Sequence, residues 1–219
     1  MKKNITYSLD SIEIKHLMNS DIRLNKLISY IGPLSIKKID NPYHFLVSQI
    51  IGQMLSKKAA ESIYNRLTNI CGEDINPQII ISHKNEIIEI GLSKSKYSYI
   101  IELSNYIISH PAFLKGLETK SDEQVISELT SIKGIGIWTA KMYLIFYLNR
   151  LDILPLEDSA FLQGLKWIAP QDLSASNDII IYTAKWKPYT SIAARYLYKA
   201  VDLNYTKKDF ITWSEETNE

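Results

Sequence analysis

The sequence predicts an all-α protein, and three features of its pattern support this. Apolar residues recur at three- and four-residue steps in one segment after another, which is the spacing of a helix face. Glycine, proline and short polar residues stand at the ends of these segments, where helices begin and end. The isoleucines at 79–81 have strand character, but no partner strand appears elsewhere. We therefore interpret residues 76–81 as a helix start and loop.

Taken in order, the apolar patterns predict ten further helices. They cover residues 17–31, 42–55, 59–67, 85–90, 94–108, 122–129, 138–147, 161–168, 179–185 and 192–201. Residues 170–176 are expected to form a polar loop. The polar tail from Lys207 is expected to be loosely held despite Phe210 and Trp213.

Length and composition set the broad class. The 219 residues, 46% hydrophobic and 22% charged, fit one large domain or two small lobes of a soluble protein. No run approaches the roughly 18 apolar residues of a membrane span, and the first ten residues lack the apolar part of a secretory signal. The single cysteine, Cys71, excludes an intramolecular disulfide and a four-cysteine iron–sulfur cluster, so we expect a cytoplasmic protein. The net charge of +1 does not by itself indicate a nucleic-acid binder.

The most informative stretch runs from residue 129 to residue 165. Lys133-Gly134-Ile135-Gly136 ends one helix, and a second begins at Trp138. The two glycines permit backbone angles that other residues resist, and a helix starting just after them directs free N–H groups outward as an anion site. Further on, a proline-containing loop brings Asp158 to the start of another helix.

This stretch resembles the helix-hairpin-helix DNA glycosylases, specifically the 3-methyladenine DNA glycosylase II branch in its short form. Residues 41–67, with a core at 48–53, are similar to the family's first barrel helix and DNA-facing turn. Residues 91–96 are similar to its central linker and 186–191 to its C-terminal helix start. The resemblance implies one glycosylase domain, 1–219, of two helical lobes flanking an active-site cleft. A middle lobe would cover about 42–147, and the second lobe residues 1–41 plus 148–219.

The resemblance assigns catalysis to Asp158. As the base departs, the sugar gains positive charge, which a carboxylate stabilises while it orients or deprotonates water. The alternative is an ordinary helix N-cap, a common position for aspartate. Its neighbour Glu157 is the other carboxylate in the loop, and the register to the following helix favours Asp158.

Trp138 follows the hairpin where strand-cleaving relatives carry a nucleophilic lysine. Without that amine no Schiff base forms, so we expect no lyase activity. An aromatic ring suits stacking on an electron-poor alkylated base, although a core tryptophan is the alternative. Trp186 and Tyr189 resemble the aromatic wall of the family's base pocket. Met142 stands where some bacterial relatives have a pocket tyrosine, which leaves the preferred base open.

DNA contacts are expected from two segments. The hairpin would grip a phosphate through N–H groups around Gly134 and Gly136, with contributions from Thr139 and Lys133. In the turn after residue 52, Met54 would wedge into the gap left by the flipped base and Gln53 would probe the opposite strand. A helix kink with Met54 in the core is the alternative.

The sequence thus predicts a monofunctional DNA glycosylase that excises alkylated purines of the 3-methyladenine or 7-methylguanine type and leaves an abasic site. The alternatives are a glycosylase for a deaminated or oxidised base and a non-catalytic DNA-binding protein. We expect a monomer that binds damaged duplex DNA, with no membrane partner and no redox or nucleotide cofactor. The histidines lack metal-ligand spacing, so no catalytic metal is expected. The resemblance implies a structural K⁺ or Na⁺ at hairpin carbonyls near Ile132 and Gly134.

Overall fold

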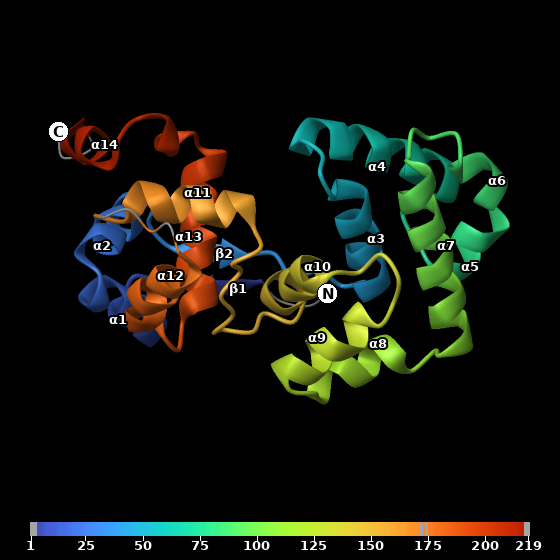
Figure 1. Ribbon diagram of the computed structural model, residues 1–219, viewed down its shortest axis with the longest axis horizontal. Helices are drawn as coiled ribbons and strands as arrows, with labels where there is room; N and C mark the ends of the chain where they lie inside the picture. Colours follow the sequence, from blue (N-terminus) through green and yellow to red (C-terminus); the bar gives the residue numbers. More distant parts are fainter. Residues whose placement is uncertain (1–3, 171–172, 174, 217–219) are drawn as a thin grey trace. The chain divides into compact units, whose positions relative to one another are not determined.

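The computed structural model describes residues 4–170, 173 and 175–216, and helices dominate it (Figure 1). This confirms the all-α prediction. The chain divides into two compact units, one of Met1–Lys38 with Arg150–Glu219 and one of Ile39–Asn149. The lobe boundaries expected from the sequence lie near residues 42 and 147. In the described part of the chain, no helix is long and apolar enough to cross a membrane.

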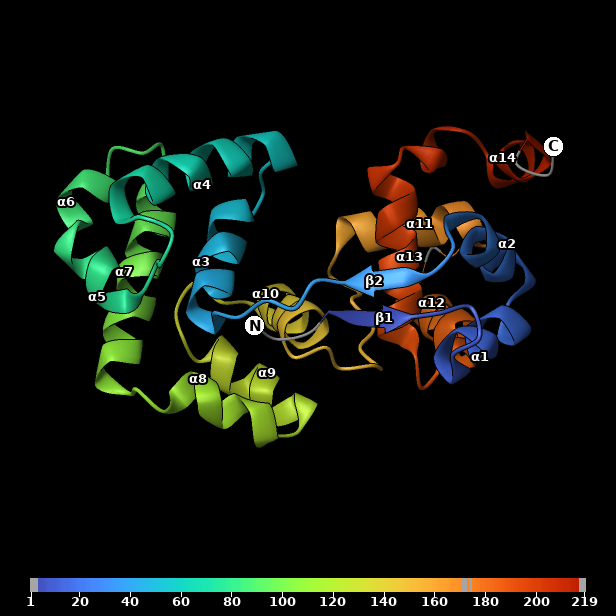
Figure 2. The same cartoon turned by 180° about the vertical axis from the view of Figure 1, so that it is seen from behind.

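The first unit joins the two ends of the chain. Its elements are β1 (Ile5–Tyr7), α1 (Ile12–Ser20), α2 (Ile22–Ile31), β2 (Leu34–Ile36), α11 (Ser159–Ile168), α12 (Ser176–Thr183), η3 (Ala184–Trp186), α13 (Thr190–Asp202), η4 (Tyr205–Lys207) and α14 (Phe210–Glu216). The strands β1 and β2 pair antiparallel, with Thr6 opposite Ser35 (Figure 2). This strand pair was not predicted from the sequence, because three residues are too few to show a period of two.

The predicted helix over 17–31 is in fact two helices that meet at Asp21. Asp21 has extended backbone angles, and its Oδ1 accepts hydrogen bonds from the N–H groups of Arg23 (3.0 Å) and Leu24 (3.2 Å). These bonds satisfy donors that the first turn of α2 leaves unpaired. The apolar spacing continues across the break, which is why periodicity alone did not reveal it.

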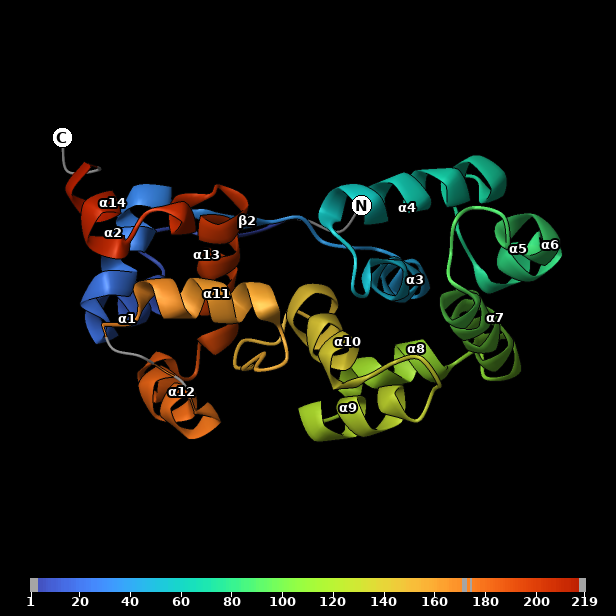
Figure 3. The same ribbon diagram turned by 45° about the horizontal axis from the view of Figure 1, so that its top comes forward.

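Helix α13 forms the centre of the first unit, with α11 lying across it (Figure 3). The crossing is close at Gly164, where a methyl group would lie 2.9 Å from Cβ of Leu197. The prediction of a loosely held tail is wrong. Phe210 and Trp213 are buried against the same core, and α14 forms around them. Two large aromatic side chains on one helix face outweigh the polar composition of the tail.

The second unit contains α3 (Pro42–Gly52), α4 (Lys57–Cys71), α5 (Pro77–Ser82), α6 (Lys84–Ile87), α7 (Lys94–Ser109), α8 (Phe113–Gly116), η1 (Leu117–Thr119), α9 (Asp122–Thr130), α10 (Ile137–Met142) and the π-helix η2 (Tyr143–Tyr147). Helix α3 contacts α4, α7, α10 and η2. Residues 76–81 were interpreted as a helix start and loop. The helix start is confirmed by α5, which Asn76 caps by accepting a hydrogen bond from Ile79, but the loop is wrong because the helix continues to Ser82.

Short polar residues cap several helices of the second unit. Asn41, Ser56, Ser93 and Ser121 each accept a hydrogen bond from a backbone N–H in the first turn that follows. A cap of this kind stabilises a helix by roughly 1 kcal/mol. Residues 171, 172 and 174 of the predicted 170–176 loop lie outside the described residues, and so do the first three residues of the chain.

Candidate functional site

In the second unit, the glycine turn joins α9 to α10. Gly134 has φ +91°, a conformation that side chains with a Cβ rarely adopt. A methyl group there would lie 2.2 Å from Cγ of Tyr99 on α7, so the turn packs directly on that ring. Gly136 differs, because no atom lies within 4 Å of its methyl position. The first glycine is therefore needed by the fold, whereas the second leaves open space beside the start of α10.

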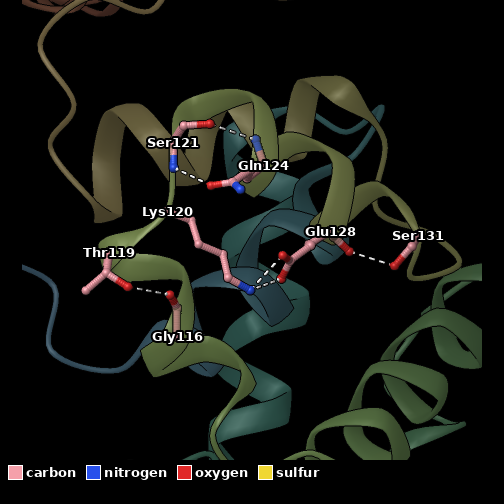
Figure 4. A network of polar contacts seen from close by, with 7 residues as sticks. All are labelled: Gly116, Thr119, Lys120, Ser121, Gln124, Glu128 and Ser131. Atoms are coloured by element: carbon pink, nitrogen blue, oxygen red, sulfur yellow. Dashed lines mark hydrogen bonds and ion pairs between the residues drawn. The ribbon is translucent and has the colours of Figure 1, made fainter.

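Helix α9, which leads into the turn, is fixed at both ends (Figure 4). Ser121 Oγ accepts a hydrogen bond from the N–H of Gln124, whose side chain accepts one from the N–H of Ser121. Lys120 Nζ lies 2.6 Å from both carboxylate oxygens of Glu128, and Ser131 Oγ donates to the carbonyl of Glu128. This arrangement sets the position from which the glycine turn departs.

Gln53 and Thr139, both expected to contact DNA, are hydrogen-bonded to each other within the protein. Gln53 Nε2 donates to the carbonyl of Gly134 (2.9 Å) and to Thr139 Oγ1 (3.3 Å). The Gln53 amide is therefore engaged within the protein, which differs from the expected probe of the opposite strand. Thr139 is buried with its hydroxyl on Gln53, so it does not face a phosphate as expected. Gln53 lies 81 residues from Gly134 and 86 residues from Thr139 in the sequence, so this arrangement depends on the fold.

Met54, by contrast, is fully exposed and has φ +56°. Its exposure removes the alternative in which it packs in the core, and its role as a wedge stays a prediction. Lys133 is also exposed, but its Nζ lies 2.9 Å from Glu102 Oε1. A hydrogen bond to Glu102 and the charge of that carboxylate raise the pKa of Lys133. An ion pair this exposed is weak, and the contact of Lys133 with a phosphate stays a prediction.

Trp138 lies partly exposed in the first turn of α10. Met142, on the same helix, was expected to line the base pocket and is only 3% exposed. It lies in the second unit directly before Tyr143, whose ring stacks on that of Tyr147 with centroids 4.8 Å apart. The expectation for Met142 is corrected accordingly, because a side chain without surface has none to offer a base.

In the first unit, Asp158 stands at the N-terminus of α11 and is 8% exposed. Its Oδ1 accepts a hydrogen bond from the N–H of Phe161 at 2.8 Å, so Asp158 is an N-cap. The loop before it is anchored to α13, since Ser191 donates from its N–H to the carbonyl of Leu151 and accepts from the N–H of Ile153, each at 2.9 Å. Glu157 is exposed, which agrees with the choice of Asp158 as the buried carboxylate.

Helix α13 brings Tyr198 to this carboxylate, a residue that the sequence did not single out. Burial raises the pKa of Tyr198, and the nearby carboxylate of Asp158 raises it further. Burial also lowers the pKa of Arg195 to about 10, against the opposing effects of Tyr7 and Tyr198. Tyr198 follows Asp158 by forty positions, and no motif marks it. Only the packing of α13 against α11 reveals that it lies near Asp158.

Trp186 was expected in the base-pocket wall and is instead 0% exposed in the core of the first unit. Its indole N–H donates to Asp21 Oδ2 (3.1 Å), which also accepts from the Tyr182 hydroxyl (3.0 Å) and pairs with Lys185 (2.9 Å). A buried carboxylate needs such donors, and this need fixes the tryptophan. Tyr189, its expected partner, is partly exposed and lies edge-on to the ring of His16.

No group of three or more His, Cys, Asp or Glu side chains suited to a metal occurs among the described residues. At the hairpin, the carbonyl of Ile132 accepts a hydrogen bond from the N–H of Ile135, and that of Gly134 accepts from Gln53. A carbonyl oxygen has two lone pairs, so these bonds leave one on each oxygen, and a monovalent cation here stays a prediction.

Comparison with known proteins places this hairpin and loop in a family. The model of the HhH-GPD superfamily of base excision DNA repair proteins matches residues 47–188, which include the turn, Trp138 and Asp158. The chain belongs to this superfamily. DNA-3-methyladenine glycosylase 1 of Schizosaccharomyces pombe is 32% identical over 216 residues, which cover 94% of each chain.

Solved structures agree with this family assignment. A DNA-3-methyladenine glycosidase from Bacillus halodurans has a TM-score of 0.77 at 35% identity and covers 90% of this chain and 92% of its own. The Schizosaccharomyces pombe 3-methyladenine DNA glycosylase in complex with abasic DNA has a TM-score of 0.75 at 28% identity, over 88% and 97% of the two chains. The prediction of a helix-hairpin-helix glycosylase fold is thereby confirmed.

Proposed function

We propose that this protein is a monofunctional DNA glycosylase that hydrolyses the N-glycosidic bond of alkylated purines in duplex DNA. The observation that carries the proposal is Asp158, a nearly buried carboxylate held at a helix start by a loop anchored to α13. The relatives named as 3-methyladenine glycosylases support the substrate class. The solved relative in complex with abasic DNA supports duplex DNA as the partner and an abasic site as the product.

The chemistry needs one carboxylate and a flipped base. A base in the duplex stack shields its glycosidic bond, so the nucleotide must first rotate out. As the base leaves, the negative charge of Asp158 stabilises the positive charge on the sugar, and the carboxylate orients or deprotonates the attacking water. Methylated purines carry positive charge and leave readily, and a partly exposed ring such as Trp138 attracts them by about 0.5–2 kcal/mol.

We infer the absence of lyase activity from the identity of residue 138. Strand cleavage by a glycosylase requires an amine that attacks the sugar and forms a Schiff base. Residue 138 carries an indole in place of the lysine, so we expect an intact strand with an abasic site. We further propose that the protein acts as a cytoplasmic monomer without a redox or nucleotide cofactor, and that K⁺ or Na⁺ at the hairpin carbonyls has a structural role.

Asp158→Asn tests the proposal, because asparagine is as good an N-cap as aspartate. The variant should keep the hydrogen bond from Phe161, and therefore its stability, while losing the negative charge. We expect release of methylated purines from alkylated duplex DNA to fall by at least about 100-fold, the scale of a lost electrostatic contact to a transition state. Glu157→Gln, an exposed neighbour with the same change in charge, is the matched control.

Freed bases and strand breaks are measured separately, the latter before alkali treatment. Equal release by wild type and Asp158→Asn would leave Asp158 as a cap only and remove the mechanism. Breaks without alkali would contradict the role given to residue 138. Binding of DNA without release of any methylated purine would favour another lesion or a non-catalytic DNA-binding protein.

A further inference from the structure

The turn that carries Met54 is held from its backbone side by a lysine of α7. Lys96 Nζ donates to the carbonyls of Ile51 (2.9 Å) and Gln53 (2.6 Å) at the C-terminal end of α3. Carbonyls at a helix end lack partners within the helix, and a cation placed on them also meets the negative end of the helix dipole. Burial lowers the pKa of Lys96. Both contacts lie just before Met54, so they restrict the backbone that presents it.

The same turn is held on its other side by the glycine hairpin. The side chain of Gln53 donates to the carbonyl of Gly134 and to Thr139, while its backbone carbonyl accepts from Lys96. Gln53 therefore connects two contacts, one through its backbone and one through its amide. The exposed Met54 is the next residue in the chain.

Helix α7 supports the turn and the hairpin from one face. Lys96, Tyr99 and Glu102 follow one another at steps of three, which places them along one side of a helix. Lys96 holds the Met54 turn, Tyr99 packs against Gly134, and Glu102 pairs with Lys133 beside it. All of these residues belong to the second unit. One rigid helix thus fixes the distance between two segments that are far apart in sequence.

We propose that Lys96 and Gln53 are positioning residues that lock the Met54 turn to the glycine hairpin, so that insertion of Met54 into the duplex and the grip on the phosphate occur as one event. This inference rests on the proposed function, in which these two segments contact DNA. Its physical basis is preorganisation, since a wedge that is already fixed loses little conformational freedom when it enters DNA.

Lys96 has a competing role as a plain phosphate contact, and the two roles differ in measurable ways. A lysine that neutralises a phosphate contributes about one unit to the slope of log affinity against log salt concentration. A lysine that braces the Met54 turn contributes nothing to that slope but is needed for insertion. Lys94→Met is the matched control for Lys96→Met, because Lys94 is exposed in the first turn of the same helix and carries the same charge.

The experiment uses the full chain as wild type, Lys96→Met, Gln53→Ala and Lys94→Met. Each variant is titrated with a duplex that contains a tetrahydrofuran abasic analogue flanked by 2-aminopurine, whose fluorescence reports insertion of a side chain into the gap. We expect Lys96→Met and Gln53→Ala to lose most of the fluorescence change and to lower kcat for release of methylated purines by about 10- to 100-fold, as misplaced groups do. Their salt slope should stay near wild type. Their melting temperatures should fall by only a few degrees, because each substitution leaves two acceptors without their protein donor, and kcat is compared well below those temperatures. Lys94→Met should keep both the fluorescence change and kcat.

Wild-type fluorescence and kcat in both Lys96→Met and Gln53→Ala would overturn the proposal. Normal insertion together with a salt slope reduced by about one unit in Lys96→Met would do the same, in favour of a phosphate contact. Where Lys96→Met does not fold, Gln53→Ala decides alone, with Gln53→Glu expected to be worse because a carboxylate repels the Gly134 carbonyl. A wild type that inserts Met54 but releases no methylated purine would refute the proposed function and leave the lock to be judged by fluorescence.

Discussion

Replacing Gly134 by alanine should destabilise the hairpin strongly. The new methyl group would lie 2.2, 2.4 and 2.6 Å from Cγ, Cβ and Cδ2 of Tyr99, whereas carbon atoms in contact are about 3.5–4.0 Å apart. One side must move by roughly 1.5 Å, and because Cβ is the base of the tyrosine side chain, a change of rotamer does not relieve the clash. The φ of +91° adds strain of about 1–2 kcal/mol for a residue with a Cβ. Overpacking of about 1–3 kcal/mol brings the expected loss to about 2–5 kcal/mol.

Denaturant unfolding of wild type, Gly134→Ala, Tyr99→Gly and the double variant separates the two terms. In the Tyr99→Gly background the steric term disappears, so Gly134→Ala should cost only the φ strain. Gly136→Ala is the control, since its methyl group meets no atom within 4 Å and its φ is −93°. It should change stability by less than about 1 kcal/mol and still weaken binding to abasic DNA where a phosphate approaches the backbone. Equal stability of Gly134→Ala and wild type would refute the reasoning.

Two further predictions concern the first unit. Gly164→Ala should destabilise it by about 1–3 kcal/mol in thermal or denaturant unfolding, because the methyl group meets Leu197 Cβ at 2.9 Å and its carbonyl at 3.2 Å; an unchanged midpoint would mean that α11 and α13 part easily. Asp21→Asn should cost about 3 kcal/mol at neutral pH, because Lys185 and the indole of Trp186 lose their carboxylate. Burial raises the pKa of Asp21, but hydrogen bonds from Lys185 and Leu24 outweigh it and lower the folded pKa below the unfolded value near 3.9. The carboxylate therefore stabilises the folded protein above that unfolded value, and this stabilisation is lost as pH falls through the folded pKa. The variant should therefore lose less stability than wild type between neutral pH and acid, and parallel pH curves would contradict this.

Local chemistry was predictable from sequence, and the reasons are physical. A short polar residue before an apolar run caps a helix through atoms two or three positions away, so the caps at Asn41, Asn76 and Asp158 need no distant partner. The glycine turn is local in the same sense, since its backbone angles depend on the residue itself. The break between α1 and α2 at Asp21 was not predicted, because this capping residue lies within an unbroken apolar pattern.

Long-range partners account for what the sequence could not supply. Trp186 and Gln53 were both assigned to ligand contacts, since an aromatic ring and an amide suit DNA. Each instead donates a hydrogen bond to a residue far along the chain. Trp186 donates to Asp21, 165 positions away, and Gln53 donates to Gly134, 81 positions away. A buried carboxylate or carbonyl binds the donor that reaches it, and sequence spacing does not indicate which donor that is.

The hydrogen bonds of Trp186 and Gln53 have different consequences for function. Trp186 is sealed in the core of the first unit, so its loss is a matter of stability and says little about which base is bound. Gln53 sits one residue from the fully exposed Met54, so its loss changes the position of a group that remains on the surface. A substitution at residue 186 should therefore act on the unfolding free energy, whereas one at residue 53 should act mainly on kcat, with a smaller fall in the melting temperature. The hydrogen bond of Trp186 thus stabilises a buried core, whereas that of Gln53 positions an exposed turn.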